Sequence, residues 1–256
     1  MKKRSVTTIL TACALFALNC QAEEIKPGRE IANGNTKYFL EANGNILYFK
    51  LDAKQVFKVL TTILGSSRKQ AMGLSNGKVL SESFNLDNDT FKMKRQVALA
   101  DGAVVVDLTV DIDKSGKTDF TAQLNYKKDF TWSDNHKRLA NMIVMETAEP
   151  VEFKAITCQD ETLNGKTEGK VDRYFLKEVT MTSVVGPITI KAENDSTFIR
   201  LSSPAALGAN FQGAYIQPGL CSPKNKGGSV HFEQGDTEVF KFSVTPAGDN
   251  KPKDDK

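Results

Sequence analysis

Cysteine and histidine are scarce in this 256-residue chain, which contains four Cys and two His. No C-x-x-C motif and no cluster of Cys with His occurs, so the sequence predicts neither a redox centre nor a zinc site. His136 and His231 stand far apart in the sequence, and no G-x-S-x-G motif supplies a nucleophile for a Ser-His-Asp assembly. We therefore expect no metal and no cofactor, and we favour a non-catalytic protein over an enzyme.

Long apolar runs are also absent, except near the N-terminus. Basic residues at positions 2–4 precede an apolar segment over residues 6–18, and polar residues follow it. This order is typical of a secretory signal peptide, and the segment is shorter than the about 20 apolar residues that a membrane-spanning helix needs. We predict a signal peptide over residues 1–22 that is cleaved after Ala22. The alternative is a lipoprotein with lipid on Cys20; either form is exported, to the periplasm or the extracellular space.

The mature chain also lacks an excess of charge of either sign. The full sequence has 34 Lys+Arg and 31 Asp+Glu, and removing the three cations of the signal peptide leaves 31 against 31. A protein that binds nucleic acid displaces counterions with a basic surface, and no basic stripe is visible here. We expect no nucleic-acid partner, no affinity for an anionic membrane surface and no transmembrane helix in the mature chain.

Only two cysteines, Cys158 and Cys221, remain after removal of the signal peptide. Two thiols in an oxidising compartment are expected to pair, and the alternative is two buried free thiols. A disulfide here would close a loop of about 60 residues and contribute roughly 4 kcal/mol in the chain-entropy model.

Most of the remaining sequence alternates between apolar and polar residues, which is the pattern of half-buried strands. The clearest case is residues 90–127, where this alternation and the turn sequences Asp101-Gly102 and Ser115-Gly116 predict a three-stranded antiparallel meander. Further strands are expected at 36–41, 45–51, 78–86, 141–157, 171–182, 187–193, 197–202, 228–233 and 237–245. The fold class is therefore mainly β, an antiparallel multi-stranded β-sandwich.

Three segments depart from this alternation. Apolar residues recur at helical spacing over residues 53–64, which predicts one short helix. Residues 201–226 are rich in Ser, Pro, Ala and Gly and are expected to form a long irregular excursion. Residues 247–256 are expected to be a disordered tail, which leaves a single β-sandwich domain over 23–246.

The single tryptophan stands beside several side chains that form hydrogen bonds. Trp132 is followed by Asp134, Asn135 and His136. Many proteins hold carbohydrate by placing an aromatic face against sugar C–H groups and using amides and carboxylates for the hydroxyls. These four residues are the candidate ligand-binding site, and the alternative is that Trp132 anchors its loop to the core.

The long amphipathic strands between residues 36 and 246, together with the closing strand GDTEVFKFSV at 235–244, resemble the large β-sandwich domains of secreted carbohydrate-active proteins. Galactose-mutarotase-like domains are the nearest of these. Mutarotases use a His pair with a Glu base, and two histidines do not fill those roles here. The resemblance therefore implies a fold and a context rather than an activity.

Three functions remain open. The first is an exported non-catalytic β-sandwich protein that binds carbohydrate. The second is an interaction or assembly component of the cell envelope, with an envelope protein as its partner. The third is a carbohydrate-active isomerase or lyase, which the small number of histidines and the lack of catalytic motifs place last.

Overall fold

The computed structural model describes the chain in several stretches, which contain nineteen strands and two short 3₁₀ turns. These stretches are residues 29–33, 36–40, 46–51, 54–64, 71–72, 77–87, 90–132, 138–183, 186–220 and 229–246. The predicted signal peptide and the predicted disordered tail lie outside them. Within them, no helix is long and apolar enough to cross a membrane.

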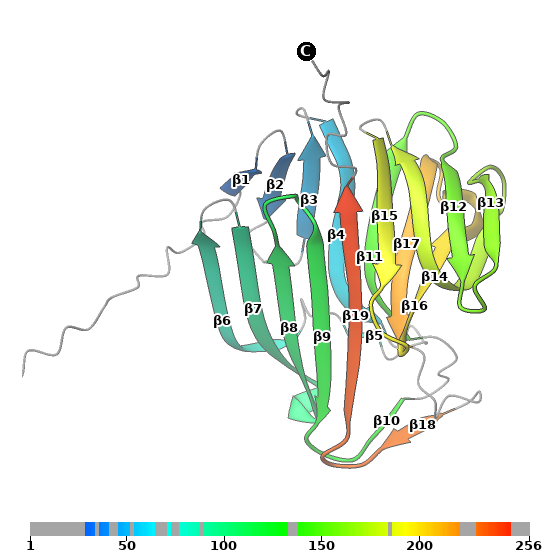
Figure 1. The fold of residues 1–256 in the computed structure, drawn as a ribbon. Helices are drawn as coiled ribbons and strands as arrows, with labels where there is room; N and C mark the ends of the chain where they lie inside the picture. Colours follow the sequence, from blue (N-terminus) through cyan, green and yellow to red (C-terminus); the bar gives the residue numbers. More distant parts are fainter. Residues whose placement is uncertain are drawn as a thin grey trace, which may run out of the picture.

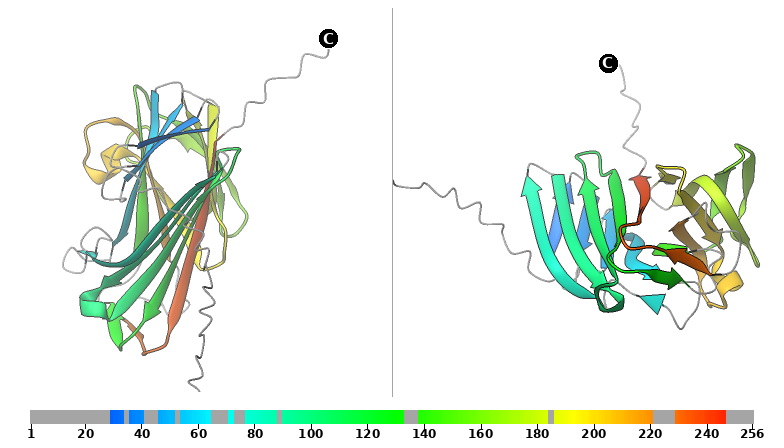
Figure 2. Two further views of the ribbon diagram at one scale, coloured as in Figure 1. Left: turned by 90° about the vertical axis from the view of Figure 1, so that its left-hand side faces the viewer. Right: turned by 90° about the horizontal axis from the view of Figure 1, so that it is seen from below.

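Two layers of antiparallel strands form a sandwich (Figures 1 and 2). The front layer, in the order of its strand pairing, consists of β6 (Lys78–Asp87), β7 (Thr90–Leu99), β8 (Val104–Ile112), β9 (Thr118–Tyr126), β19 (Thr237–Pro246), β15 (Gly186–Ala192) and β14 (Asp172–Ser183). The back layer consists of β1 (Arg29–Asn33), β2 (Thr36–Leu40), β3 (Ile46–Leu51), β4 (Lys54–Leu64), β11 (Arg138–Thr147), β17 (Gln212–Leu220) and β16 (Thr197–Ser202).

One strand belongs to both layers. The second half of β14 pairs with β15 of the front layer, whereas its first half pairs with β16 of the back layer. The other edge of β14 pairs with β12 (Glu152–Thr157), which in turn pairs with β13 (Thr162–Lys166). The sandwich is therefore joined by hydrogen bonds at the end where β14 lies.

The remaining elements are short. β5 (Ala71–Met72) pairs with the end of β4, and β10 (Phe130–Trp132) pairs with β18 (Val230–Phe232) below the front layer (Figure 1). The 3₁₀ turns are η2 (Ala100–Gly102) and η3 (Pro204–Leu207).

The predicted meander is confirmed, because β7, β8 and β9 pair in sequence over the expected residues. Their burial alternates along each strand, as the apolar pattern requires, apart from three consecutive buried residues at the start of β8. The inward-facing side chains of these strands meet those of β19, β15, β16 and β17 in one core. Residues of this core with no exposed surface include Val97, Val104, Val106, Leu124, Ile190, Ile199, Leu201, Ile216 and Phe242.

The predicted helix at 53–64 is wrong. Residues 54–64 form strand β4, which pairs with β3 on one side and with β11 on the other. Its β-branched residues Val56, Val59, Thr61, Thr62 and Ile63 suit a pleated strand, and pairing along both edges outweighs the helical spacing.

The expected irregular excursion at 201–226 is also wrong in its centre, where residues 212–220 form β17. This strand lies between β11 and β16. The register of β11 against β17 shifts opposite Pro218, which has no N–H to donate.

Candidate functional site

Trp132 packs inside the sandwich rather than on its surface. Its side chain is 1% exposed, and its Nε1 donates a hydrogen bond to Tyr126 Oη at 2.9 Å. Tyr126 Oη in turn donates to Glu238 Oε2 at 2.7 Å, and the Phe130 ring packs edge-on against the indole at 5.0 Å. These contacts agree with the interpretation that Trp132 anchors its loop to the core. Residues 133–137, which include Asp134, Asn135 and His136, lie outside the described residues.

The two predicted disulfide partners are not both described. Cys158 is exposed at the end of β12, and Cys221 lies outside the described residues, so the pairing stays a prediction. The strand pairing brings the end of β17 close to Cys158. Leu220, which directly precedes Cys221, pairs with Thr197, and Thr197 lines the same hollow of about 400 Å³ as Cys158.

A group of aromatic and polar side chains, which sequence reasoning missed, lies on the outer face of the back layer. We call this group, Asp172, Tyr174, Phe175, Arg200 and Gln217, the aromatic patch. Arg200 follows the fully buried Ile199 and precedes the fully buried Leu201, so it points away from the core. Gln217 is its partner on β17, and Asp172 and the two aromatic residues come from β14.

An irregularity in β14 brings the two aromatic residues of the patch to the same face. The register of β14 against β16 shifts between Arg173 and Leu176, and Phe175 has a φ of 57°. This is the left-handed region, which is unfavourable for a residue other than glycine. The Phe175 carbonyl accepts a hydrogen bond from the Cys158 N–H at 2.8 Å, which holds the irregularity in place. As a result, Phe175 is 39% exposed, one of the few large apolar side chains on the described surface.

Arg200 joins the aromatic and polar parts of the patch. Its guanidinium carbon lies 4.6 Å from the centre of the Tyr174 ring. Its Nε and Nη2 donate to the two carboxylate oxygens of Asp172 at 2.8 and 3.0 Å, and its Nη1 donates to Gln217 Oε1 at 2.9 Å. The Phe175 ring packs against Phe198 at 5.1 Å. These contacts fix the side chains of the patch relative to one another.

Burial raises the pKa of Tyr174, and the nearby Asp172 carboxylate acts in the same direction, while Arg200 opposes both. Burial and the charge of Glu146 likewise raise the pKa of Tyr215, whose ring packs edge-on against Phe211 on the same outer face. Both phenols therefore stay protonated at ordinary pH, and each has a hydroxyl that both donates and accepts hydrogen bonds.

Gln217 is the most deeply buried polar side chain of the patch, at 5% exposed. Its Oε1 accepts from Arg200, whereas no described residue accepts a hydrogen bond from its Nε2. An amide N–H group buried without an acceptor costs about 1–3 kcal/mol, so a water molecule or a ligand atom is expected there.

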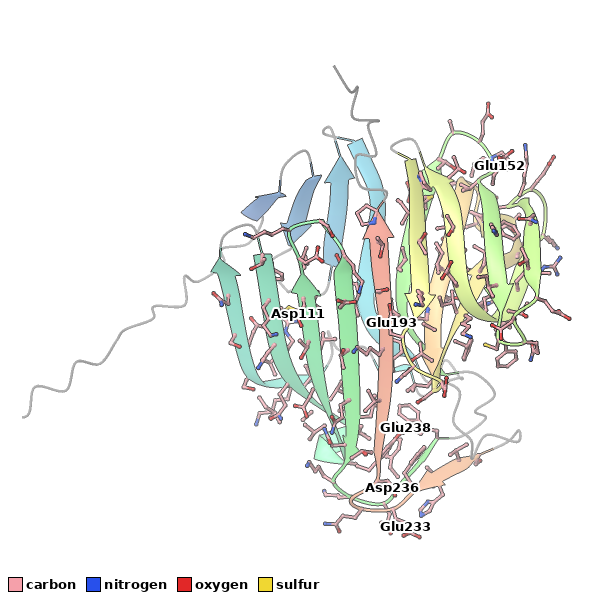
Figure 3. All side chains as sticks on the ribbon, in the orientation of Figure 1. Asp111, Glu152, Glu193, Glu233, Asp236 and Glu238 are labelled. Atoms are coloured by element: carbon pink, nitrogen blue, oxygen red, sulfur yellow. The ribbon has the colours of Figure 1, made fainter. Side chains whose placement is uncertain are left out.

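The carboxylates labelled in Figure 3 do not form a comparable site. Figure 3 shows Asp111, Glu193 and Glu152 spread along the sheet, whereas Glu233, Asp236 and Glu238 lie at its lower end. Several of them have structural partners. Asp236 accepts the Glu233 backbone N–H, and Glu193 accepts the Ser243 hydroxyl.

A second hollow, of about 510 Å³, lies over β12, β13 and β14. Glu152 and Lys166 on its wall form an ion pair at 3.0 Å, and this contact raises the pKa of Lys166. Both side chains are more than half exposed, so water screens the pair and it contributes little to stability. The hollow has no exposed aromatic side chain, and the aromatic patch is therefore the better candidate site.

Comparison with known proteins relates the chain to others through structure alone. No protein-family model matches the chain, and no curated protein matches it in sequence. Among solved structures, alpha-N-acetylgalactosaminidase NagBb from Bifidobacterium bifidum is similar with a TM-score of 0.58 and 8% identity, over 86% of this chain and 36% of that one. The Slr1438 protein from Synechocystis sp. PCC 6803 is similar with a TM-score of 0.54 and 6% identity, over 86% and 95% of the two chains. A galactose mutarotase related enzyme from Lactobacillus acidophilus has a TM-score of 0.47 and 9% identity, over 85% and 96%.

At these identities the similarity shows the fold alone. The expected resemblance to a large β-sandwich domain of a carbohydrate-active protein is confirmed at that level by the section of the galactosaminidase that the chain covers. This chain spans about a third of the galactosaminidase, so the shared part is one section of that enzyme. Any function of this chain has to be argued from its own side chains.

Proposed function

We propose that this chain is an exported, non-catalytic β-sandwich protein that binds carbohydrate through the aromatic patch. The observation that carries the proposal is the exposed Phe175 ring beside Tyr174, on which the Arg200 guanidinium is stacked. Aromatic faces pack well against the C–H faces of sugar rings, and the amide and guanidinium N–H groups alongside match their oxygens.

The chemistry of the patch supports binding rather than catalysis. Its only carboxylate, Asp172, accepts two hydrogen bonds from Arg200 and a third from Ser202 at 2.9 Å. With both oxygens already accepting hydrogen bonds, this carboxylate is poorly placed to take a proton from a bound sugar. No histidine is among the residues of the patch. These features argue against the isomerase or lyase alternative.

A glycan array probed with residues 23–256 tests this proposal. Phe175→Ala is expected to lower the affinity for any glycan that binds by about tenfold or more, because it removes the exposed ring. Leu207→Ala is the matched control, since Leu207 is 40% exposed on η3 and lies outside the patch. The proposal is wrong if the wild-type protein binds no glycan, or if both variants bind as the wild type does.

Export has its own test. The mature N-terminus is expected to be Glu23, because Ala22 is a small residue followed at once by two acidic residues. Intact-mass measurement on protein recovered from outside the cytoplasm checks this. A lipid-modified Cys20 at the N-terminus would instead identify a lipoprotein.

One observation favours the cell-envelope interaction component as a second candidate. On β6, whose only described partner is β7, Val79 and Leu80 are 48% and 46% exposed. Exposed apolar side chains on an edge strand suit pairing with another protein. Recovery of the same envelope protein with the wild type, but not with Val79→Ser/Leu80→Ser, would support this candidate.

A further inference from the structure

The polar groups of the aromatic patch that remain available to a ligand are mainly donors. Gln217 Nε2 has no described acceptor. Arg200 uses one N–H of each guanidinium nitrogen on Asp172 and Gln217, which leaves one N–H on Nη1 and one on Nη2. The guanidinium that carries these N–H groups also covers the Tyr174 ring, so the donors lie beside an aromatic surface.

The two acceptors that lie beside these donors, the Asp172 carboxylate and Gln217 Oε1, already receive hydrogen bonds. Asp172 receives Arg200 on both oxygens and Ser202 on one of them, and Gln217 Oε1 receives Arg200. A sugar hydroxyl donates and accepts through the same oxygen, so when it accepts here its own proton lies close to groups that already receive hydrogen bonds. A group that accepts on one atom and carries its donor on another fits better, because the donor can stay in solvent.

The net charge of the patch distinguishes between a neutral and an anionic acceptor group on the ligand. The positive charge of Arg200 is balanced by Asp172 in a two-point ion pair, and the Arg200 side chain is only 11% exposed. The Nε–Nη2 edge of the guanidinium binds Asp172 with two hydrogen bonds, so the charge of Arg200 is already neutralised within the patch. A neutral acceptor therefore fits better than an anionic one.

We propose that the aromatic patch selects sugars that carry an N-acetyl group, an inference that rests on the proposed carbohydrate-binding function. The acetamido carbonyl accepts from Gln217 Nε2 and the remaining Arg200 N–H groups. The acetamido methyl packs on the exposed Phe175 ring. An acetamido group thus offers an acceptor and an apolar contact together, which a hydroxyl at the same sugar position does not.

Two matched ligand series test this inference on the intact mature protein. Chito-oligosaccharides and cello-oligosaccharides of equal length share the same backbone and differ by an acetamido group or a hydroxyl at one position of each ring. Isothermal titration with each series is expected to give about tenfold or greater preference for the acetylated series, since at least one hydrogen bond and one apolar contact are gained.

Gln217→Glu probes the decisive group directly. The substitution keeps the length of the side chain and the oxygen that accepts from Arg200, but it replaces the donor NH₂ by an acceptor. The preference for the acetylated series is expected to fall by about tenfold. Gln212→Glu, at an exposed position on the same strand, is the control and should leave the preference unchanged. If Gln217→Glu does not fold, Gln217→Met removes the donor without adding a charge.

The outcomes separate this inference from the proposed function. Equal affinity for the two series, with binding still lost in Phe175→Ala, would overturn the N-acetyl preference and leave the carbohydrate-binding function standing. A preference that survives in Gln217→Glu or Gln217→Met would also overturn it. Absence of binding to every glycan would remove the proposed function itself.

Discussion

Phe175 has the least favourable backbone conformation in the aromatic patch, and it is also 39% exposed. A non-glycine residue in the left-handed region costs about 1–3 kcal/mol, which surrounding contacts have to offset. Here the Cys158 N–H holds the carbonyl, and Phe198 supports one side of the ring. An apolar side chain kept exposed in a strained position is better explained by binding than by folding.

Phe175→Gly separates these two roles. Glycine adopts the left-handed conformation without strain, so the relief of backbone strain should offset part of the lost ring contact. We expect the free energy of unfolding to change by less than about 1 kcal/mol, while glycan affinity falls by tenfold or more. Urea unfolding and titration calorimetry measure the two quantities. A loss of stability above about 3 kcal/mol would mark Phe175 as a structural residue instead.

Trp132 presents the opposite case, because its ring is buried and its Nε1 has a partner. Trp132→Ala is expected to lower the free energy of unfolding by about 3–5 kcal/mol, the usual cost of emptying a large buried aromatic site. Trp132→Phe keeps most of the volume and should cost less. Neither should change glycan affinity in protein that remains folded, and a selective loss of binding in Trp132→Phe would support the sequence-based prediction that Trp132 contacts ligand.

At the scale of elements, the sequence was most informative where burial alternates. The meander of β7, β8 and β9 has one solvent-facing and one buried face. The alternation of apolar and polar residues is therefore visible within each strand, and the meander could be predicted together with both turns. β4 and β17 could not be predicted, because pairing along both edges decides their conformation and such partners are distant in sequence.

The aromatic patch could not be predicted for the same reason. Its residues come from β14, β16 and β17, and only the pairing of these strands brings them together. The irregularity that turns Phe175 outward has no sequence signal, since Tyr174 and Phe175 read as ordinary residues of an alternating strand. Arg200, between Ile199 and Leu201, was the one visible hint of a polar outer face.

The close approach of β17 to β11 depends on one glycine. Gly213 has a φ of 136°, and a Cβ placed there would overlap the Met145 carbonyl oxygen. Gly213→Ala is therefore expected to lower the free energy of unfolding by about 3 kcal/mol or more, measured by urea unfolding. Gly235→Ala is the control, because Gly235 also has a positive φ but has open space around it, and it should cost only about 1 kcal/mol.

On the scale of the whole molecule, the predicted disulfide lies near β14, the strand that joins the two layers. Cys158 follows β12 and holds the Phe175 carbonyl, and Cys221 follows β17, which carries Gln217. A bond between the two cysteines would tie the end of β12, where the Cys158 N–H holds the Phe175 carbonyl, to the end of β17, the strand that supplies the amide.

We expect Cys158 and Cys221 to be bonded in exported protein. Peptide mapping without reduction should recover the linked pair. Cys158→Ser/Cys221→Ser should then be cut faster by protease within residues 204–226 than the parent, because the tie is lost. Two unlinked thiols in protein taken directly from the exporting compartment would contradict the pairing, and an unchanged cleavage rate would show that the bond is not structurally important.

Because β14 belongs to both layers, it joins them by hydrogen bonds along one side of the molecule. The layers cannot separate on that side without breaking the hydrogen bonds of β14 to β15 or to β16. β1 and β6 lie at the opposite ends of the two strand orders. Local unfolding should therefore begin at β1 and β6 and reach β14 last. The aromatic patch includes residues of β14, so a sugar bound there would contact the part of the molecule that unfolds most rarely. The backbone amides of β14 should accordingly be the slowest to exchange with solvent.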